Sequence, residues 1–176
     1  HDEAMLNGKK WFPYNKGGGY RKWYGNNEYL INWKEDGREL YNFKNSVIRS
    51  PQFYFREFLT WCKVTISGFS MRYIPQGFLF DVAGCSLFLE KEQMQYVLGY
   101  ANSVVNSKIL SIISPTVNYE VGHIASLPLL HTSCVKENVV RNIVGECINI
   151  AEEDWDAFEI SWSFTKHPLI SIIQKN

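Results

Sequence analysis

Apolar and polar residues follow two different repeats along this chain, and the repeat changes near residue 90. Before that point, short segments alternate apolar and polar side chains and end at glycine, proline or serine. Alternation over about five residues between such turns is typical of antiparallel strands. Asp36-Gly37 is in addition a hairpin-type turn signal. The sequence predicts a meandering sheet whose strands cover residues 28–33, 61–66, 69–74, 78–82 and 86–89.

Beyond residue 90, apolar residues from Met94 onward recur three and four positions apart. This spacing places them on one face of a helix, which Pro115 would end. A second amphipathic helix follows, with Ser133 placed to cap its start. The pattern as a whole predicts an α+β fold, with a small, mainly antiparallel sheet over about 28–90 and two principal helices over about 91–113 and 135–150.

The composition supports one globular domain over residues 1–176, opened by an irregular basic and aromatic region at 1–27. The chain has 45% hydrophobic and 20% charged residues, which is not a disordered composition. Its start has no signal-peptide pattern, and no apolar run reaches the roughly 18 residues of a spanning helix. The four cysteines are scattered singly, without zinc-ligand or disulfide spacing. We therefore expect a cytoplasmic protein with no membrane partner and no metal.

The most distinctive stretch is Lys16–Asn26, which combines three consecutive glycines, three cations and three large aromatic rings. From Lys9 to Asn27 there are five Lys or Arg and no Asp or Glu, although the net charge of the chain is zero. Glycines permit close backbone approach to a partner, and a local excess of positive charge indicates an anionic one. We expect Trp23 and Tyr24 to anchor the stretch on the domain. The alternative is a glycine-rich connector whose charges are merely solvated.

Two further features lie outside this stretch. Arg72 stands among predicted strands and could project from a sheet face, or form an ordinary salt bridge. Lys108 lies near the end of the first predicted helix and Asn118 just beyond Pro115. The alternative for this last pair is a capped helix that runs into a turn.

Several active-site signatures are missing from the sequence. There is no Asn-Pro-Pro-aromatic motif of amino-group DNA methyltransferases, no GxGxxG, no phosphate-binding loop motif and no Gly-x-Ser-x-Gly elbow. The usual metal-site motif of restriction nucleases is missing too. Carboxylates at residues 152–156 could bind a cation, but such clusters are more often solvated. We expect this chain by itself to transfer no methyl group and cut no DNA.

Four blocks of the sequence occur together in a known family. They are Lys16–Asn26 with Trp33 and Asp36-Gly37, then Phe69–Asp81, then Asn106-Ser107-Lys108 with Pro115–Asn118 and Leu127-Pro128, and finally Asp154–Phe164. Together they resemble the C-terminal part of BREX phage-defence adenine-specific DNA methyltransferases, the PglX-like family. The third block is also similar to target-recognition domains of type I and type IIG restriction–modification systems.

This resemblance implies a target-recognition domain excised from a larger enzyme. In such enzymes an N-terminal domain binds S-adenosylmethionine and carries the catalytic Asn-Pro-Pro-Tyr/Phe, so no cofactor is expected in this chain. The implied partners are double-stranded DNA, the missing N-terminal methyltransferase domain and other defence-system subunits. Cations would contact phosphates, and Arg or Asn side chains would read base edges. The expected DNA-binding residues are Lys16, Gly17, Gly18, Tyr20, Arg21, Lys22, Asn26, Arg72, Lys108 and Asn118.

Two other functions compete with this interpretation. A protein-interaction module that docks defence-system subunits would fit the neutral net charge and the acidic tail. A carbohydrate-binding module would account for the aromatic residues, but it fits poorly with the free cysteines and the basic stretch. The salt dependence of DNA binding separates the DNA-binding and protein-docking functions, because phosphate contacts release counterions.

Overall fold

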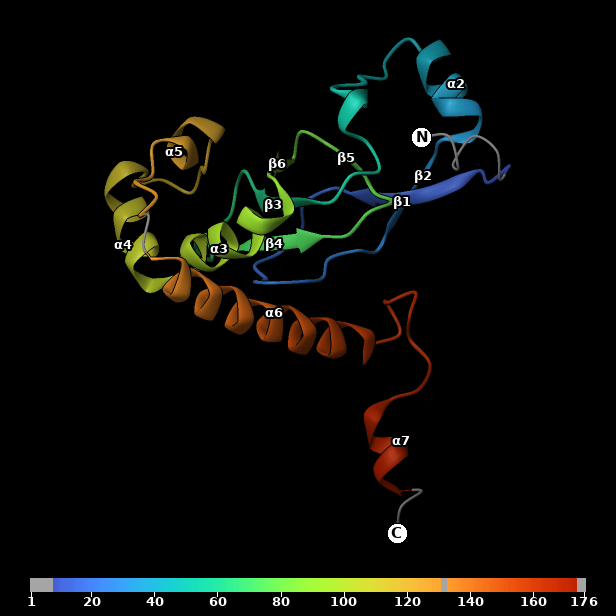
Figure 1. Ribbon diagram of the computed structural model, residues 1–176. Helices are drawn as coiled ribbons and strands as arrows, with labels where there is room; N and C mark the ends of the chain where they lie inside the picture. Colours follow the sequence, from blue (N-terminus) through green and yellow to red (C-terminus); the bar gives the residue numbers. More distant parts are fainter. Residues whose placement is uncertain (1–7, 131–132, 174–176) are drawn as a thin grey trace.

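The computed structural model describes residues 8–130 and 133–173 (Figure 1). The described residues confirm an α+β fold, with two small three-stranded sheets in place of the single sheet predicted over 28–90. In sheet A, β1 (Trp11–Asn15) lies between β2 (Tyr29–Asn32) and β5 (Leu79–Phe80). β1 is antiparallel to β2 and parallel to β5.

The first of these strands corrects the expectation of an irregular region at 1–27, of which residues 1–7 lie outside the described part. β1 buries Phe12 and Asn15. The sequence did not indicate a strand here, because Pro13 lies in the middle of the segment and proline is rarely found inside a strand. Pro13 pairs with Leu30 of β2, whereas β5 meets only Tyr14 and the residue after it. Proline therefore lies where sheet A is two strands wide.

Sheet B is antiparallel, with β3 (Phe58–Cys62) between β4 (Met71–Ile74) and β6 (Gly84–Leu87). All five residues of β3 are buried. Side chains from one face of sheet B form the main core with apolar residues of α3 and α6, described below. Buried members of this core are Leu59, Trp61, Phe69, Met71, Cys85, Met94, Leu98, Ala101, Leu110, Val144 and Ile148.

The helix predicted over 91–113 is two helices, α3 (Lys91–Ala101) and α4 (Val104–Ile113). The Asn102 side chain causes the break, because its amide accepts from the Met71 N–H and donates to the Met71 carbonyl, each at 2.9 Å. Ser103 then caps α4 by accepting from the Asn106 N–H at 3.1 Å. Polar side chains that bond to backbone in this way compete with helix continuation. The predicted apolar stripe ends with α3, and Ile112 on α4 is 81% exposed.

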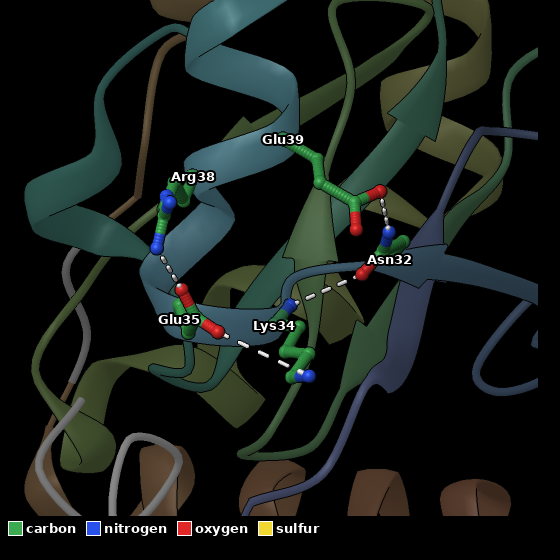
Figure 2. Close-up of polar contacts among 5 residues, drawn as sticks. All are labelled: Asn32, Lys34, Glu35, Arg38 and Glu39. Atoms are coloured by element: carbon green, nitrogen blue, oxygen red, sulfur yellow. Dashed lines mark hydrogen bonds and ion pairs between the residues drawn. The ribbon is translucent and has the colours of Figure 1, made fainter.

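Asp36-Gly37 does not form the predicted hairpin turn. After β2 the chain enters α2 (Lys34–Asn42), whose residues 35–37 have left-handed backbone angles. Figure 2 shows the polar contacts at this entry: Asn32 accepts from the Lys34 N–H and donates to Glu39. The Trp33 indole N–H donates to Asp36 at 3.0 Å. A side chain at Gly37 would collide with the Trp33 ring, so the glycine is needed for this close turn.

Four further helical segments complete the described part of the chain. They are the 3-10 turn η1 (Pro51–Phe53), α5 (Val121–Ala125), the 23-residue α6 (Cys134–Asp156) and α7 (Pro168–Ile173). α6 extends the predicted 135–150 helix and packs on α3, where Gly99 lies against Val140 and Val144. α5 lies between Pro115 and Pro128. Figure 1 shows α6 running along sheet B and α3, with α7 projecting away from both.

Candidate nucleic-acid interface

Residues 16–26, here called the glycine loop, lie against the second face of sheet B. Directly before the loop, the buried Asn15 amide donates to the Thr60 hydroxyl at 2.8 Å. Gly17 has a φ of +88°, and a Cβ added at Gly84 would lie only 3.0 Å from its nitrogen. Both glycines therefore serve close packing of the loop on the sheet, in addition to any approach to a ligand. Gly18 and Gly19 remain exposed.

Arg72 lies fully buried between sheet B and the loop. Its guanidinium donates from Nη2 to the Gly17 carbonyl at 3.3 Å and from Nη1 to the Arg21 carbonyl at 3.5 Å. Burial lowers the pKa of Arg72. Within the described part of the chain no carboxylate pairs with it, so the salt-bridge alternative does not apply there. Arg72 therefore holds the two ends of residues 17–21 in place from beneath.

The second half of the loop is attached to the edge of sheet B. The backbone N–H of Trp23 donates to the Met71 carbonyl at 3.0 Å, and the Trp23 carbonyl accepts from the Tyr73 N–H at 2.8 Å. Trp23 thereby forms an isolated parallel β-bridge with Arg72 of β4. The partly buried rings of Trp23 and Tyr24 pack against the main core. The predicted anchoring role of these two residues is confirmed.

Two of the three loop cations are engaged by the protein itself. Arg21 pairs with Asp154 of α6 at 2.9 Å, and its guanidinium lies 5.2 Å from the Trp155 ring centroid. Lys22 donates to the Asn102 carbonyl at 2.8 Å, directly after α3. A cation is stabilised at that position, because the last carbonyls of a helix carry partial negative charge. Lys16 is exposed, with its Nζ 5.6 Å from the Tyr29 ring centroid.

Carboxylates of α6 also affect the inner side of the loop. Burial and the negative charge of Glu152 raise the pKa of Tyr24 to about 12. Gly25 lies against Trp155 of the same helix, and a Cβ there would come within 2.9 Å of its ring. The loop is thus clamped between sheet B and the C-terminal part of α6, which leaves its outer surface to Lys16, Gly18, Gly19 and Tyr20.

The structure brings together eight of the ten predicted DNA-binding residues and leaves two apart. Seven of these eight residues belong to the glycine loop, and Arg72 supports the loop from sheet B. The last of the seven, Asn26, has a φ of +61°, and its side-chain amide donates to the Gly19 carbonyl at 2.9 Å. Lys108 is exposed on α4. Asn118 precedes α5 and bridges to Val64, beyond the end of β3.

Sequence reasoning missed Asp154, Asn15 and Asn102 as determinants of the loop. Asp154 and Arg21 lie 133 residues apart, and no local spacing could have paired them. The acidic cluster at 152–156 was the available signal, since it carries the charge that the loop lacks. Among the described residues there is no group of three or more His, Cys, Asp or Glu arranged to hold a metal ion. No described helix is both long and apolar enough to cross a membrane.

Comparison with known proteins gives the loop a context. The chain is 41% identical, over 92% of its length, to the adenine-specific methyltransferase BrxX of Escherichia coli O9:H4 (strain HS). It is 40% identical, over 96% of its length, to the adenine-specific methyltransferase PglX of Lacticaseibacillus casei (strain Zhang). The chain is homologous to a segment of these adenine-specific methyltransferases. The resemblance to PglX-like enzymes that the sequence blocks indicated is confirmed.

The similarity to these methyltransferases is confined to a small part of them. The chain spans 13% of the BrxX protein and 14% of the PglX protein. No protein-family model matches the chain. The two names describe the complete relatives.

Proposed function

We propose that this chain is the DNA target-recognition domain of a site-specific adenine-N6 DNA methyltransferase and has no methyl-transfer activity of its own. The carrying observation is its 40–41% identity to two adenine-specific methyltransferases over nearly its whole length. The parent enzyme would act in cytoplasmic phage defence of the BREX type or in restriction–modification. Its catalytic domain would bind S-adenosylmethionine, and the catalytic domain and this chain would together bind double-stranded DNA.

The glycine loop is the part of the domain best suited to contact DNA phosphates. Its outer surface carries Lys16 and exposed glycine backbone, while Arg72 and Trp23 fix its conformation from the inner side. A fixed loop loses little conformational freedom when it binds. Arg21 is 30% exposed in its pair with Asp154, so a phosphate would compete with that carboxylate for the same guanidinium. Such contacts position a domain on DNA without reading its sequence.

The test is a salt titration of duplex binding by the complete methyltransferase carrying this chain. Lys16→Ala with Arg21→Ala removes two loop cations, and we expect binding to weaken on specific and non-specific duplexes alike. The slope of log K against log salt should flatten by roughly 0.9 for each lost phosphate contact. Lys34→Ala with Arg38→Ala is the matched control, because it removes two exposed cations of α2 (Figure 2). α2 follows β2 beyond Asn32, which pairs with Trp11 at the end of sheet A opposite to the glycine loop.

An unchanged salt slope in the loop variant would remove the glycine loop from the DNA surface. An equal loss in the α2 control would show that the response is a general effect of net charge.

A protein-docking module of a defence system is the second candidate function. It is favoured by the internal partners of Arg21 and Lys22 and by exposed apolar side chains on α4 and α6. Docking of a protein partner, in contrast to phosphate binding, need not depend on these cations or on salt. The same titration therefore separates the two functions.

A further inference from the structure

The long helix α6 has apolar side chains on two opposite faces. Val144, Ile148 and Trp155 are buried against the domain. A second row, here called the outer stripe, is 53–74% exposed and consists of Val135, Val139, Ile143 and Ile150.

The positions of the outer stripe match one side of a helix. At 100° per residue, steps of four and seven residues return to nearly the same direction, so the four side chains share one narrow face. That face points away from Val144. Among the described residues, Figure 1 shows no other helix or strand along the side of α6 that faces away from sheet B and α3. A row of exposed aliphatic residues on an otherwise packed helix marks an interaction surface, whereas scattered ones are ordinary.

We propose that the outer stripe of α6 docks against the remainder of the methyltransferase polypeptide to which this chain belongs, an inference that rests on the proposed function. The homologous relatives are about seven times longer than the matched segment. The match covers 96% of this chain with PglX, which is too much to leave out the 23 residues of α6. The helix is thus part of the segment that the longer enzymes share.

Charge within the stripe indicates what the partner surface contains. Glu146 and Glu153 are exposed, and at 100° per residue both point in nearly the same direction as Val135, within the stripe. A complementary surface is therefore an apolar strip with Lys or Arg facing these two carboxylates. A second copy of the chain fits less well, because both copies would bring the same two carboxylates to the contact.

The experiment places one negative charge within the outer stripe of α6 and, as a control, one beside it. Val139→Glu puts it in the outer stripe, and Asn149→Glu puts it on the same helix beside the stripe, at another exposed position. In the complete methyltransferase we expect Val139→Glu to speed amide hydrogen exchange in α6 at least about tenfold, because docking is lost. Asn149→Glu should leave exchange unchanged. In the 176-residue chain alone, where the stripe faces solvent, both variants should exchange like the parent sequence.

Two results would overturn the inference. One is a complete enzyme in which Val139→Glu exchanges like Asn149→Glu. The other is a 176-residue chain that forms dimers in sedimentation and loses them with Val139→Glu, since the stripe would then bind a second copy. Neither result depends on DNA. The salt slope of the loop variant tests the proposed function separately, so each of the two can fail while the other stands.

Discussion

Arg72 donates from Nη2 to the carbonyl oxygen of Gly17, 3.3 Å away and 55 residues earlier in the sequence. This bond joins a fully buried guanidinium on sheet B to the backbone of the glycine loop. The cation most deeply placed in the domain therefore shapes the loop instead of facing a ligand directly. The proposed DNA contacts of Lys16 and Arg21 depend on that shape.

Removal of this support should loosen the loop. In Arg72→Met the carbonyls of Gly17 and Arg21 lose their buried donor, and we expect the free energy of unfolding to fall by about 1–3 kcal/mol. Amides of residues 17–21 should also exchange faster. Urea denaturation and hydrogen exchange measure the two effects, with Arg38→Met as a control because Arg38 is an exposed cation. Parent-like stability and exchange in Arg72→Met would contradict the supporting role.

The pair between Arg21 and Asp154 should limit DNA binding. Asp154→Asn frees the guanidinium, so we expect tighter duplex binding and a salt slope steeper by roughly 0.9. The stability of the domain should change by less than about 1 kcal/mol, since the pair is partly exposed to solvent. Glu153→Gln removes the same charge one residue away, and it should alter binding much less. Equal tightening in both variants would indicate a general charge effect.

Two glycines of the loop should differ sharply in their tolerance of alanine. Gly25 has a φ of +111°, and an added Cβ would lie 2.6 Å from Cδ of Arg21. We expect Gly25→Ala to lower the free energy of unfolding by about 1–3 kcal/mol through overpacking. A Cβ at Gly19 meets nothing within 4 Å, so Gly19→Ala should be nearly neutral. Chemical denaturation of the two variants side by side tests this, and similar losses would argue against the loop conformation described.

High pH should weaken the domain through its partly buried tyrosines. The pKa of Tyr24 is about 12 in the folded chain, mainly because of burial, against about 10 when unfolded. Its contribution to stability is therefore complete below pH 10 and is lost as the pH rises through 12. Burial raises the pKa of Tyr14 and Tyr73 in the same direction.

Urea denaturation between pH 8 and pH 11.5 measures this loss of stability. Tyr24→Phe removes one ionisable group, so its stability should fall less steeply above pH 10 than that of the parent chain. The same slope in both proteins would mean that Tyr24 titrates normally in the folded state.

The amino-acid sequence by itself determined the local features of this protein. The period-two segments at 28–33, 69–74, 78–82 and 86–89 contain β2, β4, β5 and β6 in whole or in part, and the helical stripe after residue 90 became α3, because side-chain alternation depends only on neighbouring positions. The strand predicted over 61–66 was largely wrong, because β3 covers Phe58–Cys62 and is buried on both faces. The basic and aromatic character of residues 16–26 was equally local. The sequence did not predict β1, because Pro13 disturbed its alternating pattern. It did not predict the break between α3 and α4 either, because the Asn102 amide bonds to the backbone of Met71, 31 residues earlier.

Only the tertiary structure decided what the loop residues do. Whether Arg21 is free, and whether Arg72 faces solvent, depends on Asp154 and on the backbone of Gly17, which lie 133 and 55 residues away. The division of the strands into two sheets was decided in the same way, since β1 pairs with β5 across more than sixty positions. Such pairings follow from the packing of the whole chain around its cores, and no repeat of apolar and polar residues records them.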